Sequence, residues 1–238
     1  MCAAIHVHRR LLMYAGGCVL LASLLLGGTP CAAQGLRPRV HAAYGSNLLL
    51  SPGTDLQSSP GRTGQLGFSL AIGRPDAKLA FVPALRASQH AFRTRMAYRV
   101  HFSTIRSQFD LDLAMGLRQM SGTMWQFGAF VGTVSKVTNR IEQQAGNNTF
   151  PTYPLTTLRS ELYDRTQLGA LIALWVPLDE GHRWGLDLMA RYHFTPLVKD
   201  GQEVALVHRP PQPVTADNTR PVTLTIGLNY GFAGRGKE

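Results

Sequence analysis

The sequence predicts an all-β protein in which eight antiparallel strands close into an up-and-down barrel. Hydrophobic residues recur at every second position in runs of up to about ten residues, which is the period of a half-buried strand. No helical period continues beyond two turns in the part of the chain after residue 35. The links between the runs alternate between short and long, as they do in a meander of hairpins.

Each run is justified by its own alternation. The first run places Val40, Ala42 and Tyr44 on one face, and the last alternates from Val222 to Phe232. The run near 167–176 is apolar on both faces, so alternation does not define which of its residues point inward. In chain order the eight predicted strands are 39–44, 65–73, 78–87, 109–118, 125–133, 167–176, 184–194 and 222–232.

The links separate two ends of the barrel. Three are short and rich in Gly, Pro or Asp, which favours tight turns. Short periplasmic turns and long external loops are typical of barrels in an outer membrane. The short links are 74–77, 119–123 and 177–182, and the long links are 46–63, 88–108, 135–166 and 195–221.

The first 33 residues have the pattern of a secretory signal peptide. His8-Arg9-Arg10 is the cationic start, Leu11 to Leu26 is the apolar segment, and Cys31-Ala32-Ala33 is a small-residue cleavage site. A transmembrane anchor and a lipoprotein, with Cys31 as the acylated residue, are the alternatives. Cleavage leaves residues 34–238 as one barrel domain.

Composition after cleavage narrows the chemistry. The chain contains three cysteines, and Cys2, Cys18 and Cys31 all lie in the leader, so the domain has no disulfide and no thiolate metal site. The remaining histidines show no metal-ligand spacing, and we expect no cofactor. Only 16% of the 238 residues are charged. Although the net charge is +10, this low charge density argues against a nucleic-acid partner.

The two faces of the predicted strands distinguish lipid from water. One face carries no charged residue, whereas the other mixes charges with Gly, Ala, Ser and Thr. An Arg or Lys at the bilayer midplane costs ~2–4 kcal/mol, so a charge-free face is what contact with lipid selects. The alternative is a soluble, lipocalin-like periplasmic barrel that binds a ligand. In such a barrel the polar face points outward to water and the apolar face points inward. The pattern favours the outer membrane.

Four segments resemble the PorT-like outer-membrane β-barrel family common in Bacteroidetes. They are Leu79-Ala80-Phe81-Val82-Pro83-Ala84-Leu85-Arg86, Gln126-Phe127-Gly128-Ala129-Phe130-Val131-Gly132, the stretch from Gly185 to Tyr192, and Ile226-Gly227-Leu228-Asn229-Tyr230-Gly231-Phe232. The resemblance implies an eight-stranded membrane barrel without enzyme activity. It also implies contact with the barrel assembly machinery and with secretion or envelope proteins.

Charged residues on the inward face form the first candidate site. Asp110 and Asp112 are two positions apart on one strand, about 7 Å from each other. Buried charges need partners, so we expect a polar network in the lumen. Its predicted members are Arg86, Asp110, Asp112, Arg118, Asp187 and Arg191. The alternative is an acid/base pair of Asp110 and Asp112 in a membrane-barrel hydrolase acting on lipid or peptide.

A second candidate site lies in the link 88–108, where arginines alternate with aromatic residues and no acid occurs. This alternation predicts that the hairpin continues as strands beyond the membrane. Arginine binds phosphate with two hydrogen bonds, so contact with lipopolysaccharide is the functional hypothesis. A solvated hairpin with cross-strand pairs is the alternative. The residues concerned are Arg93, Arg95, Arg99 and Arg106.

Overall fold

The computed structural model describes residues 35–50, 56–74, 77–96, 100–143, 163–197 and 220–232. The predicted leader, residues 1–33, lies outside these ranges. The described part of the chain contains no helix long and apolar enough to cross a membrane. Its strands are β1 (Arg37–Leu50), β2 (Leu56–Ser59), β3 (Gly61–Ala71), β4 (Leu79–Met96), β5 (Val100–Arg118), β6 (Met124–Gln143), β7 (Thr166–Pro177), β8 (Trp184–His193) and β9 (Arg220–Gly231).

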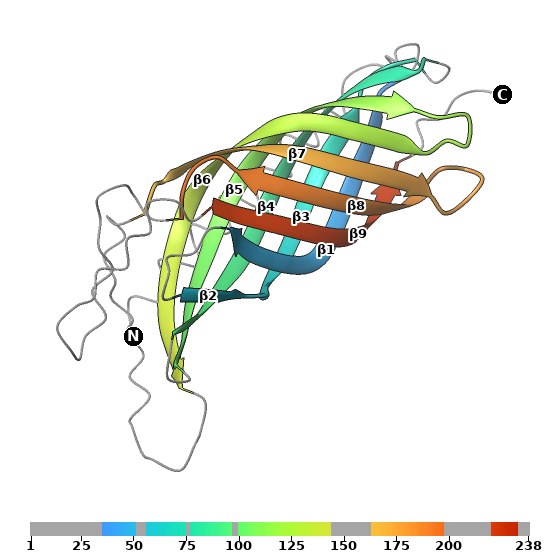
Figure 1. The fold of residues 1–238 in the computed structure, drawn as a ribbon. Helices are drawn as coiled ribbons and strands as arrows, with labels where there is room; N and C mark the ends of the chain where they lie inside the picture. The colour runs from blue at the N-terminus through green and yellow to red at the C-terminus, as the bar shows by residue number, and fades with distance from the viewer. Residues whose placement is uncertain are drawn as a thin grey trace, which may run out of the picture.

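Eight of these strands form a closed antiparallel barrel, which confirms the predicted fold class (Figure 1). The sheet runs from β3 through β1, β9, β8, β7, β6 and β5 to β4, and β3 pairs with β4 to close the ring. Closure leaves no free edge along the barrel wall. The start of β1 and the end of β9 lie side by side, since Arg39 is opposite Gly231.

The ninth strand, β2, is not part of the ring. It covers four residues of the first long link and pairs with the far end of β4, where Ser59 is opposite Arg93. The β3–β4 pairing ends at His90, and β2 pairs with β4 beyond that point. Strand β4 therefore continues past the end of β3.

Strands β4, β5 and β6 are much longer than the sequence runs that identify them. They have 18, 19 and 20 residues, whereas β7, β8 and β9 have 12, 10 and 12. The predicted extension of the hairpin as strands beyond residue 88 is confirmed for the backbone. A register shift at Ser107 and Gln108 marks a β-bulge between β5 and β6, and Figure 1 shows the three strands projecting beyond their neighbours.

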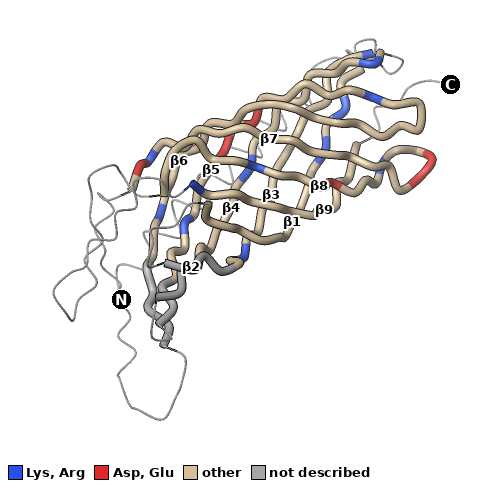
Figure 2. The backbone as a smooth tube through the Cα atoms, in the orientation of Figure 1, with Lys and Arg blue, Asp and Glu red and all other residues tan. Residues whose placement is uncertain are grey.

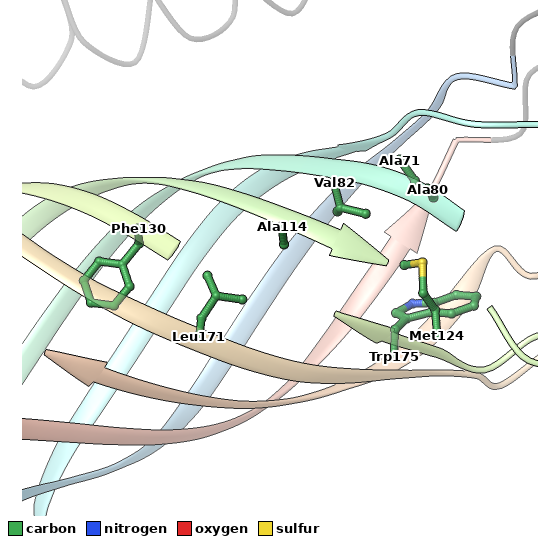
Figure 3. Close-up of a cluster of buried hydrophobic side chains, with 8 residues drawn as sticks. All are labelled: Ala71, Ala80, Val82, Ala114, Met124, Phe130, Leu171 and Trp175. Atoms are coloured by element: carbon green, nitrogen blue, oxygen red, sulfur yellow. The ribbon is translucent and has the colours of Figure 1, made fainter. Parts of the chain in front are cut away.

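The short-turn end of the barrel is filled by apolar side chains from the inner face. Figure 3 shows Met124 beside Trp175, with Phe130 and Leu171 further along the interior. These contacts settle the phase of β7, because Leu171, Ala173 and Trp175 are buried whereas Leu168 and Ile172 are exposed. The full cluster is Ala71, Ala80, Val82, Ala114, Met124, Phe130, Leu171 and Trp175.

Candidate functional site

The centre of the barrel interior holds an ion-paired layer. Arg191 on β8 donates from Nη1 to Asp110 Oδ2 at 2.7 Å and from Nη2 to Asp112 Oδ1. Arg86 on β4 donates from Nε to the other oxygen of Asp112, at 2.5 Å. All four side chains are buried. The layer therefore places two arginines against two aspartates, as a buried network requires.

The register explains why these four residues meet. Asp110 and Asp112 are two positions apart on β5 and so point to the same side of the sheet. Arg86 is directly opposite Asp110 on the neighbouring strand. Arg191 reaches the same carboxylates from three strands away around the ring. The layer thus ties opposite walls of the barrel together and fills its narrow interior.

A second layer, made of neutral polar side chains, lies on the long-link side of the first. His90 Nε2 is 2.9 Å from Ser88 Oγ, and His90 Nδ1 is 3.0 Å from Thr63 Oγ1 and 3.2 Å from Asn47 Oδ1. Ser88 in turn donates to Asp110 at 3.3 Å, which links the two layers. Gln108 also donates to Asp110.

Ser88, His90 and Asn47 are arranged in space like a hydrolase triad, because the His90 imidazole lies between a hydroxyl and an amide oxygen. Their surroundings are those of a packed interior. The His90 side chain has no exposed surface, and the Ser88 hydroxyl donates to a carboxylate that is already ion-paired. These contacts make the three residues part of the interior network.

Arg106 lies on the long-link side of the ion-paired layer and corrects one sequence-based prediction. It was predicted to meet lipopolysaccharide, but it is only 1% exposed and points into the barrel. The reason is strand alternation, because Arg106, Gln108 and Asp110 share the inward face of β5. Arg106 donates to Gln167 Oε1 at 2.9 Å, and its guanidinium lies over the ring of Phe92.

The other three arginines of that prediction are placed only in part. Arg93 is half-buried on the outward side of β4. Arg95 is in β4, opposite His101, but its side chain lies outside what the structure describes. Arg99 lies outside the described residues altogether.

Two of the six residues predicted for the lumen network lie nearer the turn end than the ion-paired layer. Arg118 is at the turn end of β5 and donates to the carbonyl oxygen of Arg74 at 2.5 Å. It is the last residue of its strand, where the interior opens to the turns. Asp187 is buried nearer that end, where it is attracted by Arg86 of the ion-paired layer and, less strongly, by Arg39, and it hydrogen-bonds to Asn229. The Arg39 guanidinium carbon lies 4.0 Å from the centre of the Trp175 ring.

The sequence-based reasoning missed several polar members of the interior. His41 Nε2 lies 2.6 Å from Arg86 Nη1 and extends the ion-paired layer to β1. All these residues follow the inward alternation of their strands. That signal already covered His41 and Thr223 within the predicted strands, and it would have found Asn47, Thr63, Ser88, His90 and Gln108 had the strands been extended to their true ends. Among them are His41, Asn47, Thr63, Ser88, His90, Gln108, Gln167 and Thr223.

The outer surface of the barrel carries an apolar belt. On β4, β5 and β6 it consists of five cross-strand rows, and at least one large hydrophobic side chain in every row is exposed. The next row is polar. The five rows are Leu79–Leu117–Trp125, Phe81–Met115–Phe127, Pro83–Leu113–Ala129, Leu85–Leu111–Val131 and Ala87–Phe109–Thr133, and the polar row is Gln89–Ser107–Lys136.

The height of the belt matches a membrane. The stretch from Leu79 to Ala87 rises about 27 Å along the strand, or roughly 20 Å along the barrel axis at an ordinary strand tilt of about 40°. A transmembrane barrel has an apolar band about 25 Å tall. Figure 2 shows how few charges lie along the strands. The chain is an outer-membrane β-barrel. The soluble-barrel alternative is excluded, since it would expose this entire belt to water.

Comparison with known proteins yields structural likeness only. No family model matches the chain, and no curated protein is significantly similar to it. Among solved structures, it resembles Neisserial surface protein A, with 14% identity over 83% of this chain and 97% of the other and a TM-score of 0.40. It also resembles Ail, the attachment invasion locus protein of Yersinia pestis, with 9% identity, coverage of 83% and 99%, and a TM-score of 0.45.

A further similar structure is the outer membrane enzyme PagL, with 14% identity, coverage of 81% and 98%, and a TM-score of 0.37. The barrel assignment for this chain rests on its own strand register and apolar belt.

Proposed function

We propose that this protein is a non-enzymatic, non-conducting outer-membrane barrel of the PorT-like type that acts through its external surface. The observation that carries the proposal is the extension of β4, β5 and β6 beyond the apolar belt. A tilted strand needs about 9–11 residues to cross a bilayer. These strands have 18 to 20.

The extra length forms a structured platform. From Gln89 to Met96, β4 continues for about 25 Å past the belt, paired with β5 along this length. Ordering so much backbone outside the membrane costs conformational entropy, which a barrel serving only as a wall would not need to spend. The ion-paired layer supports the same proposal, because an interior filled with side chains leaves no open channel.

The platform would take part in envelope structure, adhesion or assistance to protein secretion. Its outward side carries exposed cations just beyond the belt, Arg62 on β3 and Lys136 on β6, and half-buried Arg93 on β4 lies in the same region. Arg and Lys near the outer leaflet suit the phosphates of lipopolysaccharide. We therefore keep lipopolysaccharide as a partner and place Arg62 and Lys136 in the role first given to Arg106.

Shortening the platform tests this function. Residues 92–104 are replaced by Asn-Gly, which joins the paired residues Ala91 and Ile105 by a two-residue turn. We expect a barrel that still shows heat-modifiable migration in gels but has lost adhesion to host or abiotic surfaces, or secretion of envelope cargo. A barrel that keeps both activities would contradict the proposal.

Lipopolysaccharide contact is tested separately. The double variant Arg62→Gln, Lys136→Gln is purified from outer membranes in mild detergent, and co-purified lipopolysaccharide is measured against the wild type. We expect retention to fall several-fold. A matched control is Arg183→Gln, at the turn end, which should retain the wild-type amount.

A further inference from the structure

Arg106 is a fully buried cation whose hydrogen-bond partners are all neutral. Nη1 donates to Gln167 Oε1 at 2.9 Å, Nη2 lies 3.5 Å from His193 Nδ1, and the guanidinium carbon is 5.2 Å from the centre of the Phe92 ring. No carboxylate of the described residues forms an ion pair with it. Burying an ionised group without a counter-charge is costly.

The carboxylate of Asp110, which attracts Arg106, already has other hydrogen-bond partners. Asp110 attracts Arg106 electrostatically, but its oxygens accept hydrogen bonds from Arg191, Ser88 and Gln108. Asp112 is shared by Arg86 and Arg191. The ion-paired layer is therefore balanced within itself, and Arg106 is a surplus positive charge on its external side.

Two donors of this group have no acceptor. The Arg106 Nε–H makes no hydrogen bond, and neither does His193 Nε2. Because an arginine always donates, its contact with His193 Nδ1 requires a lone pair on that nitrogen. A neutral His193 then carries its proton on Nε2. Both open positions are thus N–H donors, and both are buried on the long-link side of the ion-paired layer.

We propose that Arg106 and His193 form a binding site for a small oxyanion, a phosphate or a carboxylate group, on the external side of the ion-paired layer in the barrel interior. The anion would accept the two open hydrogen bonds and neutralise the surplus charge. Water would satisfy the donors but leave the charge unbalanced. The inference does not depend on the external platform, since these side chains face inward.

The ligand group could belong to lipopolysaccharide or to a free ion, and one experiment separates the two sources. The barrel is refolded from inclusion bodies into a zwitterionic detergent free of lipopolysaccharide, and its unfolding midpoint is measured against inorganic phosphate at constant ionic strength. Parallel samples contain intact or dephosphorylated lipopolysaccharide. A ligand that binds only the folded barrel raises the midpoint in a saturable manner.

We expect phosphate, or intact but not dephosphorylated lipopolysaccharide, to stabilise the wild type. Stabilisation by phosphate identifies a free-ion site, and stabilisation by intact lipopolysaccharide alone identifies a headgroup site. In Arg106→Gln the apparent affinity should fall at least tenfold, whereas the exposed turn-end control Arg183→Gln should leave the phosphate response unchanged. Arg106→Gln should also be less sensitive than the wild type to removal of anions.

Two results would overturn the proposal: a wild type that responds to neither ligand, or an Arg106→Gln variant that responds as the wild type does. If Arg106→Gln does not refold, Arg106→Lys replaces it. Lysine keeps the charge but lacks the Nε–H of the guanidinium, so its phosphate affinity should still be clearly weaker, and an unchanged affinity would contradict the site. Broadening of the ³¹P resonance of phosphate by the wild-type protein gives a second measurement of binding, which does not rely on the unfolding midpoint.

Discussion

Arg191 on β8 and Asp110 on β5 are separated by two intervening strands, yet Arg191 Nη1 lies 2.7 Å from Asp110 Oδ2. Hydrogen bonds of the sheet link only neighbouring strands. This ion pair, together with the one to Asp112, instead links opposite walls across the interior. The sheet hydrogen bonds therefore hold the strands together around the barrel, and the ion pairs hold separated strands together across its interior.

Removal of Arg191 should be severely destabilising. In Arg191→Met, Asp110 and Asp112 would remain buried with Arg86 as the one cation of the layer. Breaking a buried ion pair costs about 3–5 kcal/mol because a charge is left uncompensated. Urea unfolding in lipid vesicles measures the loss, and Arg62→Met, at an exposed outward position, should change stability by no more than about 0.5 kcal/mol.

Restoring the charge balance should recover part of this loss. Arg191→Met combined with Asp110→Asn leaves Asp112 paired with Arg86. We expect the double variant to be more stable than Arg191→Met alone. Equal stability of the two would show that packing, rather than charge, accounts for the role of Arg191.

The outer belt predicts a depth-dependent cost of inserting charge. Leu113 lies in the middle row of the belt and Leu117 in the row nearest the turns, on the same face of β5. Leu113→Arg should cost ~2–4 kcal/mol in a bilayer, and Leu117→Arg no more than about 1 kcal/mol. Unfolding in vesicles measures both. Equal costs for the two substitutions would contradict the placement of the belt.

Gly132 should be required for the position of Asp110. A methyl group at Gly132 would lie 2.1 Å from Asp110 Oδ1, whereas one at Gly64 would meet no atom within 4 Å. The carboxylate cannot easily move, because three other side chains donate to it. We expect Gly132→Ala to lose ~1–3 kcal/mol by overpacking. Gly64→Ala is the matched control on the open side, and a similar loss in both would refute this explanation.

The sequence predicted the barrel wall well because half of each strand contacts lipid there. Apolar residues at every second position, as in Phe109, Leu111 and Leu113, identify both the strand and its outward face. Beyond the membrane the outward face becomes polar, so the hydrophobic period disappears although the strand continues. For this reason the stretch around Arg106 was assigned to a long link. Its continuation as strands was predicted, but the inward direction of Arg106 was not.

The phase of β7 could not be predicted for the opposite reason. Leu171 and Trp175 point inward, where they fill the turn end of the interior, whereas Leu168 and Ile172 point outward to lipid. With apolar residues on both faces, alternation carries no signal. The ion pairs across the interior were equally hidden, because the sequence shows which residues face inward but not which of them meet from opposite walls.

The turn between β7 and β8 predicts a local dependence on pH. Asp179 accepts hydrogen bonds from the backbone N–H groups of Trp184 at 2.6 Å and Arg183 at 3.2 Å. Desolvation acts to raise the pKa of Asp179, but these two hydrogen bonds, with the nearby His182 and Arg183 charges, lower it overall. The folded-state pKa is therefore below the unfolded-state value.

It follows that the carboxylate stabilises the turn fully at pH values above its ordinary, unfolded-state pKa. This contribution is lost as the pH falls through the lowered pKa of the folded state. The carboxyl resonance of Asp179 and the Trp184 amide resonance should titrate together in NMR spectra, below the range of an ordinary Asp. In Asp179→Asn the Trp184 amide should no longer respond to acid in this range. A Trp184 amide that still titrates in that variant would assign the response to another group.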